Sequence, residues 1–273
     1  MSAVRPPAVA GMFYPADPRQ LEHDVQKYLA AAQPLAFQPK ALIVPHAGYI
    51  YSGAIAASAY ATLKTVAPRI RRVILLGPTH RVAVRGLALP DTDAFDTPLG
   101  RIPLDTDAMR TIARLPQVTV SGEAHEEEHS LEVQLPFLQS VLGEFALLPL
   151  AVGMATAEEV AEVLEAVWGG DETLIIISSD LSHYLPYATA QFADNNTAQD
   201  ILKLHRQINH EQACGGTPIS GLMIAARKHH LSPHLLDLRN SGDTAGSHDR
   251  VVGYAAFAFT QTAGTGEEFP HAN

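Results

Sequence analysis

Short apolar runs alternate with longer helical segments along this chain, and that alternation predicts an α/β protein. The clearest strand is the continuous apolar run at residues 174–177, which is typical of a strand buried on both faces. No linker, repeat or low-complexity segment interrupts residues 1–260. We therefore expect one domain over residues 1–261, a sandwich with a central, mostly parallel sheet flanked by helices, followed by a frayed tail at 262–273.

The first half of the chain supplies two strands that each end in a loop with a proline and a histidine. Asp17 and Pro18 predict a helix running to about Ala32, since a capping carboxylate and a proline both suit a first turn. Strands are expected at 41–44 and 73–76. The remaining elements expected here are a helix over 52–66, a short strand at 87–89, and helices over 105–115 and 130–142.

The second half continues the alternation of strands and helices. A strand at 145–152 precedes a helix over 156–167, in which apolar residues recur on one face. The strand at 174–177 follows. The rest is predicted as helices over 189–206 and 220–228, and strands at 235–238 and 251–259.

Composition narrows the classes of partner. The formal net charge is −10 and no basic run is present, which argues against nucleic acid and anionic membrane surfaces as partners. Cys214 is the only cysteine, so no internal disulfide can form, and a lone thiol suits a reducing compartment. No signal peptide or membrane-spanning apolar stretch is recognisable, so we expect a cytoplasmic protein.

Three histidines follow three of the predicted strands. His46 lies in the loop after 41–44, His80 in the loop after 73–76, and His183 in the loop after 174–177. Ligands of open α/β sheets bind beyond the carboxyl ends of the strands, so parallel strands would gather these rings at one edge. Imidazole serves as a metal ligand and as an acid–base group. The alternative is that each ring is an isolated surface or core histidine.

Two further residues have both a functional and a structural interpretation. His129 follows an acidic stretch, and spacing alone favours a solvated helix start with Ser130 as its cap. Cys214 is flanked by glycines that would let the backbone approach a bound group, or it is a buried, inert thiol. The chain lacks the sequence motifs of serine hydrolases, P-loop NTPases and Rossmann dinucleotide-binding enzymes.

The order of these segments resembles the Memo family, whose prokaryotic members are called AmmeMemoRadiSam system protein B. Each segment alone is a weak signal, but their order and spacing together are specific. The resemblance runs nearly end to end and rests on residues 10–15, 45–49, 51–53, 77–80, 128–135, 178–183, 214–218, 240–244 and 251–254.

The family is structurally similar to class III extradiol dioxygenases, which bind Fe(II) through two histidines and a glutamate. The resemblance implies that His46 and His80 are the matching ligands, with Cys214 in the place of the glutamate. It also implies an acid–base role for His183 and a pocket position for His129, and the expected catalytic residues are His183, His129 and Asp180. A thiolate is a softer ligand than a carboxylate, so the expected single ion is Fe(II) or copper, with zinc as an alternative, and ring cleavage is not carried over.

Three functions stay open at this point. The first is a non-haem iron or copper redox protein with a dioxygenase-like pocket. The second is a non-catalytic module that binds a metal or an unknown small molecule and works with a radical S-adenosylmethionine protein and a third system protein, the partners implied by the family name. The third is a zinc hydrolase, since two histidines and a cysteine form a known catalytic zinc set.

Overall fold

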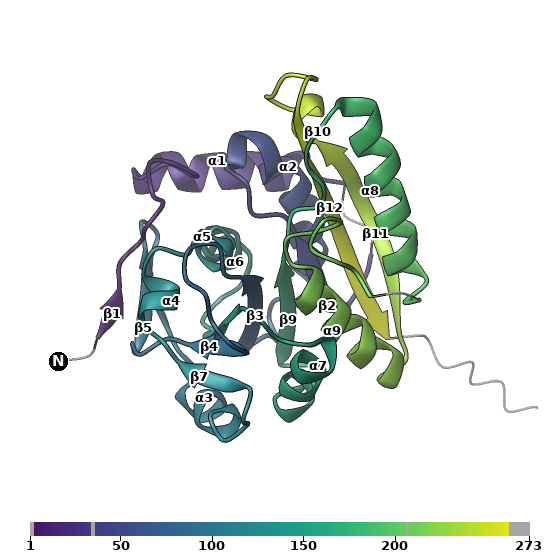
Figure 1. Cartoon of the computed structure of the whole chain (residues 1–273). Coiled ribbons are helices and arrows are strands. Elements are labelled where there is room, and N and C mark those ends of the chain that lie inside the picture. The colour runs from purple at the N-terminus through teal and green to yellow at the C-terminus, as the bar shows by residue number, and fades with distance from the viewer. Residues whose placement is uncertain (1–2, 34–35, 206, 262–273) are drawn as a thin grey trace, which may run out of the picture.

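Four parallel strands form the middle of the main sheet in the computed structural model (Figure 1). They are β2 (Pro39–Val44), β9 (Thr173–Ser178), β3 (Arg72–Pro78) and β8 (Ala146–Val152), adjacent in that order. Because they run in the same direction, their carboxyl ends lie at one edge of the sheet. The prediction of a central parallel sheet is confirmed.

Antiparallel strands extend this centre on both sides. On one side β12 (Val251–Gln261) pairs with β2, with β11 (Leu231–Asn240) and with β10 (His183–Leu185). On the other side β4 (Leu87–Leu89) pairs antiparallel with β8 and parallel with β7 (Val118–Val120).

A second, small sheet lies outside the main one. It contains β1 (Val4–Arg5), β5 (Ala94–Thr97) and β6 (Gly100–Pro103). The sequence analysis predicted none of these three strands, nor β7 and β10. They are two to four residues long, so they offer little hydrophobic period to read, and unlike the all-apolar β4 they mix apolar and polar residues.

Helices cover both faces of the main sheet, as expected. One face carries α2 (Tyr49–Tyr60) and the short helix η1 (Ala61–Thr65), with α1 (Pro18–Ala31) and α6 (Leu135–Val141) packed beside them. The other carries α3 (Thr106–Ile112), α7 (Ala157–Ala166), α8 (Tyr187–Leu202) and α9 (Gly216–Lys228) (Figure 1). The sheet separates two hydrophobic cores, one on each face. Along β2, the side chains of Leu42 and Val44 pack in the core on the α2 face, whereas Ile43 packs in the other core, because successive side chains of a strand point to opposite faces.

The single helix predicted over 130–142 is wrong, because two helices occupy this stretch. They are α5 (His129–Glu132) and α6, which begins again at Leu135. Pro136 lies in the first turn of α6, where its missing N–H costs nothing, but inside one long helix it would break the hydrogen-bond ladder. The break leaves the Gln134 side chain free to donate a hydrogen bond to the Pro45 carbonyl, 2.9 Å away.

The structure describes residues 3–33, 36–205 and 207–261. The frayed tail predicted at 262–273 therefore lies outside the described residues. Two further short helices complete the described elements, α4 (Glu123–Glu126) and η2 (Ser241–Asp243). Across the described ranges, no helix combines the length and the apolar character needed to cross a bilayer.

A buried carboxylate fixes the N-terminal segment against the region of α4 and α5. Glu132 is fully buried, and its carboxylate forms an ion pair with Arg5 at 2.7 Å. It also accepts hydrogen bonds from the Tyr14 hydroxyl and from the N–H groups of Ala8 and Val9. Arg5 in turn donates to the carbonyls of His125 and Glu128. The N-terminal segment therefore holds in place the residues that surround α5.

Replacing Arg5 by methionine should strongly destabilise the fold, because the Glu132 carboxylate then stays buried without its cation. We expect the free energy of unfolding to fall by about 3–5 kcal/mol, measured by urea titration. The matched control is Arg81→Met, which removes an exposed pair with Glu127 and should cost at most about 1 kcal/mol. Equal losses in the two variants would contradict this account.

Candidate metal site

His46 follows β2 and is buried against the neighbouring strand β9. Its backbone N–H donates to Asp180 Oδ1 at 2.8 Å, and its ring Nδ1 lies 2.9 Å from Ser178 Oγ. Both partners come from the end of β9, which pairs in parallel with β2 so that Val44 lies opposite Ser178. With Nδ1 engaged by Ser178, Nε2 is the ring nitrogen left for another partner.

His80 follows β3 and is held by Glu128. The Glu128 carboxylate lies 2.9 Å from His80 Nδ1. It also accepts hydrogen bonds from the backbone N–H groups of His80, at 2.6 Å, and Ser130, at 2.9 Å. Burial opposes ionisation of Glu128, but these hydrogen bonds and the charge of His80 lower the pKa of its carboxyl to about 2. An ionised carboxylate therefore joins the loop after β3 to the start of α5.

His129 is the first residue of α5, and its ring completes a group of three imidazoles. It stacks on His80 with ring centroids 4.6 Å apart and lies edge-on to His46 at 5.4 Å. One nitrogen from each of His46, His80 and His129 lies within 4.8 Å of the others. A metal–imidazole site has bonds of roughly 2.0–2.1 Å, so an ion between these rings would draw the three nitrogens closer together, and the donor set itself fits an ion.

A close approach of backbone segments makes this group possible. A Cβ added at Gly77, in β3, would lie 2.8 Å from Ser130 Oγ and 3.0 Å from Leu131 Cδ2. Glycine at this position lets α5 pack directly on the strand that leads to His80. A larger residue at 77 would push α5, and His129 with it, away from the other two rings.

The environment keeps two of these imidazoles, those of His46 and His129, neutral. Burial, together with the charges of His80, His129 and His183, lowers the pKa of His46 well below its ordinary value of 6.5. Burial also lowers the pKa of His129 to about 4, although the Glu128 charge acts in the opposite direction. A neutral imidazole has a free lone pair, which is the form that binds a metal ion.

Cys214 lies next to His46 but outside the group of three rings. Its Sγ is 3.4 Å from His46 Nε2. Gly215 lets this loop approach β9, because a Cβ there would lie 2.6 Å from the Ser179 Cβ, and its N–H donates to Ser179 Oγ. Burial first, and then the Asp180 charge, raise the pKa of the thiol to about 12, so without an ion Cys214 carries its proton.

Asp180 and His183 flank the group on the β9 side. The Asp180 carboxylate accepts the backbone N–H groups of His46 and Ala47, and burial raises its pKa to about 7 in spite of those bonds. His183 begins β10 and is half-buried, and its pKa is lowered, chiefly by burial. The charge of His183 is one of the causes that lower the pKa of His46, so His183 lies near the three rings, but it is not a member of the group.

The sequence analysis missed the residues that hold the rings. Glu128 was visible beside His129, but its partner His80 is 48 residues away in the chain. Ser178 and Gln134 lie in segments that carry the family resemblance, but nothing in the sequence assigned either a role, since a serine ending a strand and a glutamine between two helical turns are ordinary. Their roles depend on which segments the fold brings together.

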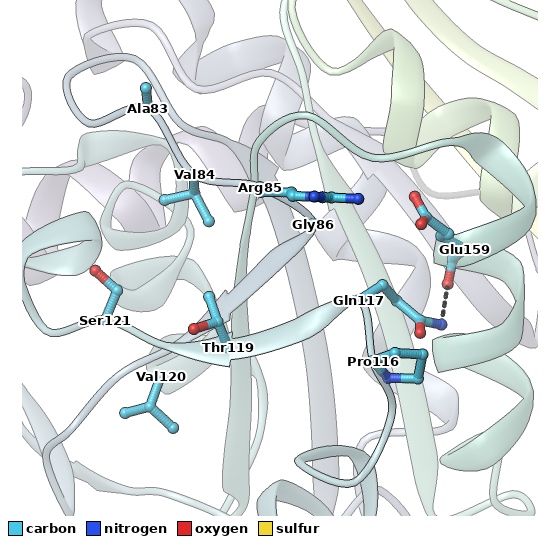
Figure 2. A pocket seen from close by; sticks show the side chains of 10 residues that line it. All are labelled: Ala83, Val84, Arg85, Gly86, Pro116, Gln117, Thr119, Val120, Ser121 and Glu159. Atoms are coloured by element: carbon cyan, nitrogen blue, oxygen red, sulfur yellow. Dashed lines mark hydrogen bonds between the residues drawn. The ribbon is translucent and has the colours of Figure 1, made fainter.

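A separate cleft of about 790 Å³ lies away from this group. Figure 2 shows that it is formed by the segment before β4, the start of β7 and the first turn of α7, with Arg85, Gln117 and Glu159 around it. Gln117 Nε2 donates to the Glu159 carbonyl at 3.3 Å. None of the predicted site residues lines this cleft, and no histidine or cysteine does either.

Comparisons of this chain with a family model and with individual proteins agree on one family. The model of the family described as "Memo-like protein" matches residues 5–258. A MEMO1 family protein of Aquifex aeolicus is 35 % identical over 269 residues, covering 94 % of this chain and 99 % of that protein. A MEMO1 family protein of Methanosarcina barkeri is 36 % identical over 270 residues, covering 93 % and 98 %.

The fold also resembles a solved structure. An uncharacterized protein of Escherichia coli K12 superposes with a TM-score of 0.51 at 12 % identity, covering 80 % of this chain and 98 % of that one. At this identity the likeness concerns the fold alone. The similarity to extradiol dioxygenases stays a prediction.

The lowered pKa of His129 makes stability depend on pH. An unfolded chain binds this proton near pH 6.5, whereas the folded protein does so near 4, so the folded state loses stability as the pH falls through this window. We expect the unfolding free energy of the wild type, minus that of His129→Asn, to fall by roughly 3 kcal/mol from about pH 7 to about pH 4.

Urea unfolding at each pH, with a chelator present, measures this difference. Subtracting the variant from the wild type cancels the contribution of titrating groups that do not interact with His129. A difference that stays constant across the window would show that the ring is not held neutral at this position.

Proposed function

Because this chain belongs to the Memo family, we propose that it binds one redox-active metal ion, Fe(II) or copper, beyond the carboxyl ends of β2, β9 and β3. The convergence of three imidazoles from three separate segments carries this proposal, and burial keeps those of His46 and His129 neutral. His46 and His80 are the proposed common ligands, because each has Nδ1 engaged by a neighbouring side chain, which leaves Nε2 as the nitrogen that can bind an ion. When bound, such an ion supplies electron transfer and a site for a small oxidant.

Two residues compete for the third ligand position. Cys214 is the ligand that the family resemblance implies, and His129 is the one grouped with His46 and His80. In a tetrahedral site with a metal–sulfur bond of about 2.3 Å and a metal–nitrogen bond of about 2.0 Å, the sulfur and nitrogen atoms lie roughly 3.5 Å apart. The 3.4 Å between Cys214 Sγ and His46 Nε2 supports a shared ion, and we propose Cys214 as the third ligand.

The remaining residues would handle protons and substrate. Cys214 must release its proton to coordinate, so uptake of the ion would release a proton to the solvent. Asp180 holds the backbone that carries His46, and a carboxyl with a pKa of about 7 can exchange protons near neutral pH. His183 and His129, both only partly exposed, are the proposed acid–base residues facing a small molecule.

One observation favours a second function, a metal-binding module that works with a protein partner. Large apolar side chains are exposed on three segments next to site residues: Met12 at 69 %, Ile50 at 65 % and Tyr184 at 63 %. Phe13, adjacent to Met12, contacts the His129 ring, and Tyr184 follows His183. A radical S-adenosylmethionine protein and a third system protein are the proposed partners, in the cytoplasm, and their co-purification with a protein inactive alone would support this function.

Metal analysis tests the main proposal. Anaerobic reconstitution should load one Fe(II) or copper ion per chain, and the loaded protein should then consume oxygen in an electrode assay. We expect His46→Ala and His80→Ala each to weaken binding by more than the 10–100-fold typical of outer-shell changes. His23→Ala, an exposed position on α1, is the control. Binding that survives the loss of both rings would end the proposal, and one zinc per chain with no oxygen uptake would favour a hydrolase.

Comparing Cys214→Ser with His129→Ala identifies the third ligand. If Cys214 coordinates, the copper(II) form of the wild type should show a sulfur-to-metal charge-transfer band in the visible spectrum. This band should vanish in Cys214→Ser and persist in His129→Ala. Absence of the band in the wild type, together with loss of binding in His129→Ala alone, would assign the position to His129 instead.

A further inference from the structure

A chain of buried polar groups leads from the His46 ring into the core between β9, α5 and α6. Its members are all at most 2 % exposed. They are connected by short hydrogen bonds, from Tyr60 Oη to Gln134 Oε1 (2.8 Å), from Gln134 Nε2 to Ser178 Oγ (2.8 Å), from Ser178 Oγ to the Ser130 carbonyl (2.5 Å), and between Ser178 Oγ and His46 Nδ1 (2.9 Å).

The orientation of the Gln134 amide follows from its partners. The Pro45 carbonyl, 2.9 Å away, can only accept a hydrogen bond, so the amide nitrogen must face it. The same nitrogen then donates its second hydrogen to Ser178 Oγ, while Oε1 accepts the Tyr60 hydroxyl. Gln134 therefore gives a hydrogen to Ser178 and can accept none from it.

Counting hydrogens at Ser178 then determines the state of His46. The hydroxyl has one hydrogen, and the Ser130 carbonyl, at 2.5 Å, can only accept it. One lone pair of Oγ accepts from Gln134, so the second lone pair faces His46 Nδ1. Nδ1 must therefore carry the ring hydrogen and donate it, which leaves the lone pair of the neutral ring on Nε2.

We propose that Ser178 is a positioning residue that holds His46 as the Nδ1–H tautomer, with the Nε2 lone pair directed at the metal position. The Nε2 atom is the one that lies 3.4 Å from Cys214 Sγ. The metal-binding consequence rests on the proposed function, whereas the tautomer itself does not. Glu128, which has no hydrogen to donate when ionised, acts in the same way on His80 Nδ1.

The tautomer is measured directly in metal-free protein. Long-range ¹H–¹⁵N correlation spectra of chelator-treated, ¹⁵N-histidine-labelled protein distinguish a protonated Nδ1 from a protonated Nε2, and His46→Asn assigns the signals. We expect Nδ1–H in the wild type. Ser178→Ala removes the acceptor, so the Nε2–H form should become populated, and metal affinity should fall by about 10–100-fold.

Gln134→Met is the matched control. It disrupts the same buried network but leaves Ser178 able to donate to Ser130 and to accept from His46. It should lower stability, yet retain the Nδ1–H signal, whereas a merely structural role for Ser178 predicts the same spectrum in all three proteins.

The two proposals fail in different ways. Nε2–H in the wild type, or a spectrum unchanged in Ser178→Ala, would overturn the inference even if the protein binds metal. Nδ1–H in a wild type that binds no metal would uphold the tautomer and overturn the proposed function.

Discussion

The site depends on one buried carboxylate, that of Glu128, staying ionised. It accepts the backbone and ring nitrogens of His80 and the backbone N–H of Ser130, so it joins the end of β3 to the start of α5. A charge buried to this extent is stable only with several hydrogen-bond donors, which are supplied by the two segments that it connects. Behind it, Arg5 and Glu132 hold the same region against the N-terminal segment.

Strand β9 plays the corresponding part for His46. It lies between β2 and β3 in the sheet, and the residues at its end, Ser178 and Asp180, contact the ring and the backbone of His46. A parallel neighbour is well suited to this, because both strands end at the same edge and their last residues lie opposite one another. The loops that carry His46 and His80 are thus each held by polar groups from an adjacent element.

Burial gives the site its chemical character. Because the rings of His46 and His129 are kept neutral, their lone pairs are available at pH values where exposed imidazoles would begin to take up protons. The Cys214 thiol, by contrast, must lose its proton before it can bind a metal ion. Burial keeps the thiol protonated until a nearby cation stabilises the thiolate. An ion shared by these groups would replace a thiol–imidazole contact with two bonds to the metal.

The sequence by itself determined the central strands and the loops that follow them. Continuous apolar runs are long enough to be recognised, and a histidine after a parallel strand lies at the same sheet edge whatever the details of packing. Only the tertiary structure decided that His129 joins His46 and His80, that Cys214 lies beside His46 Nε2, and that Ser178 faces Nδ1. These contacts join residues up to 168 positions apart, and they depend on packing that no local pattern records, including a helix interrupted before Pro136 and a glycine at 77 that admits α5.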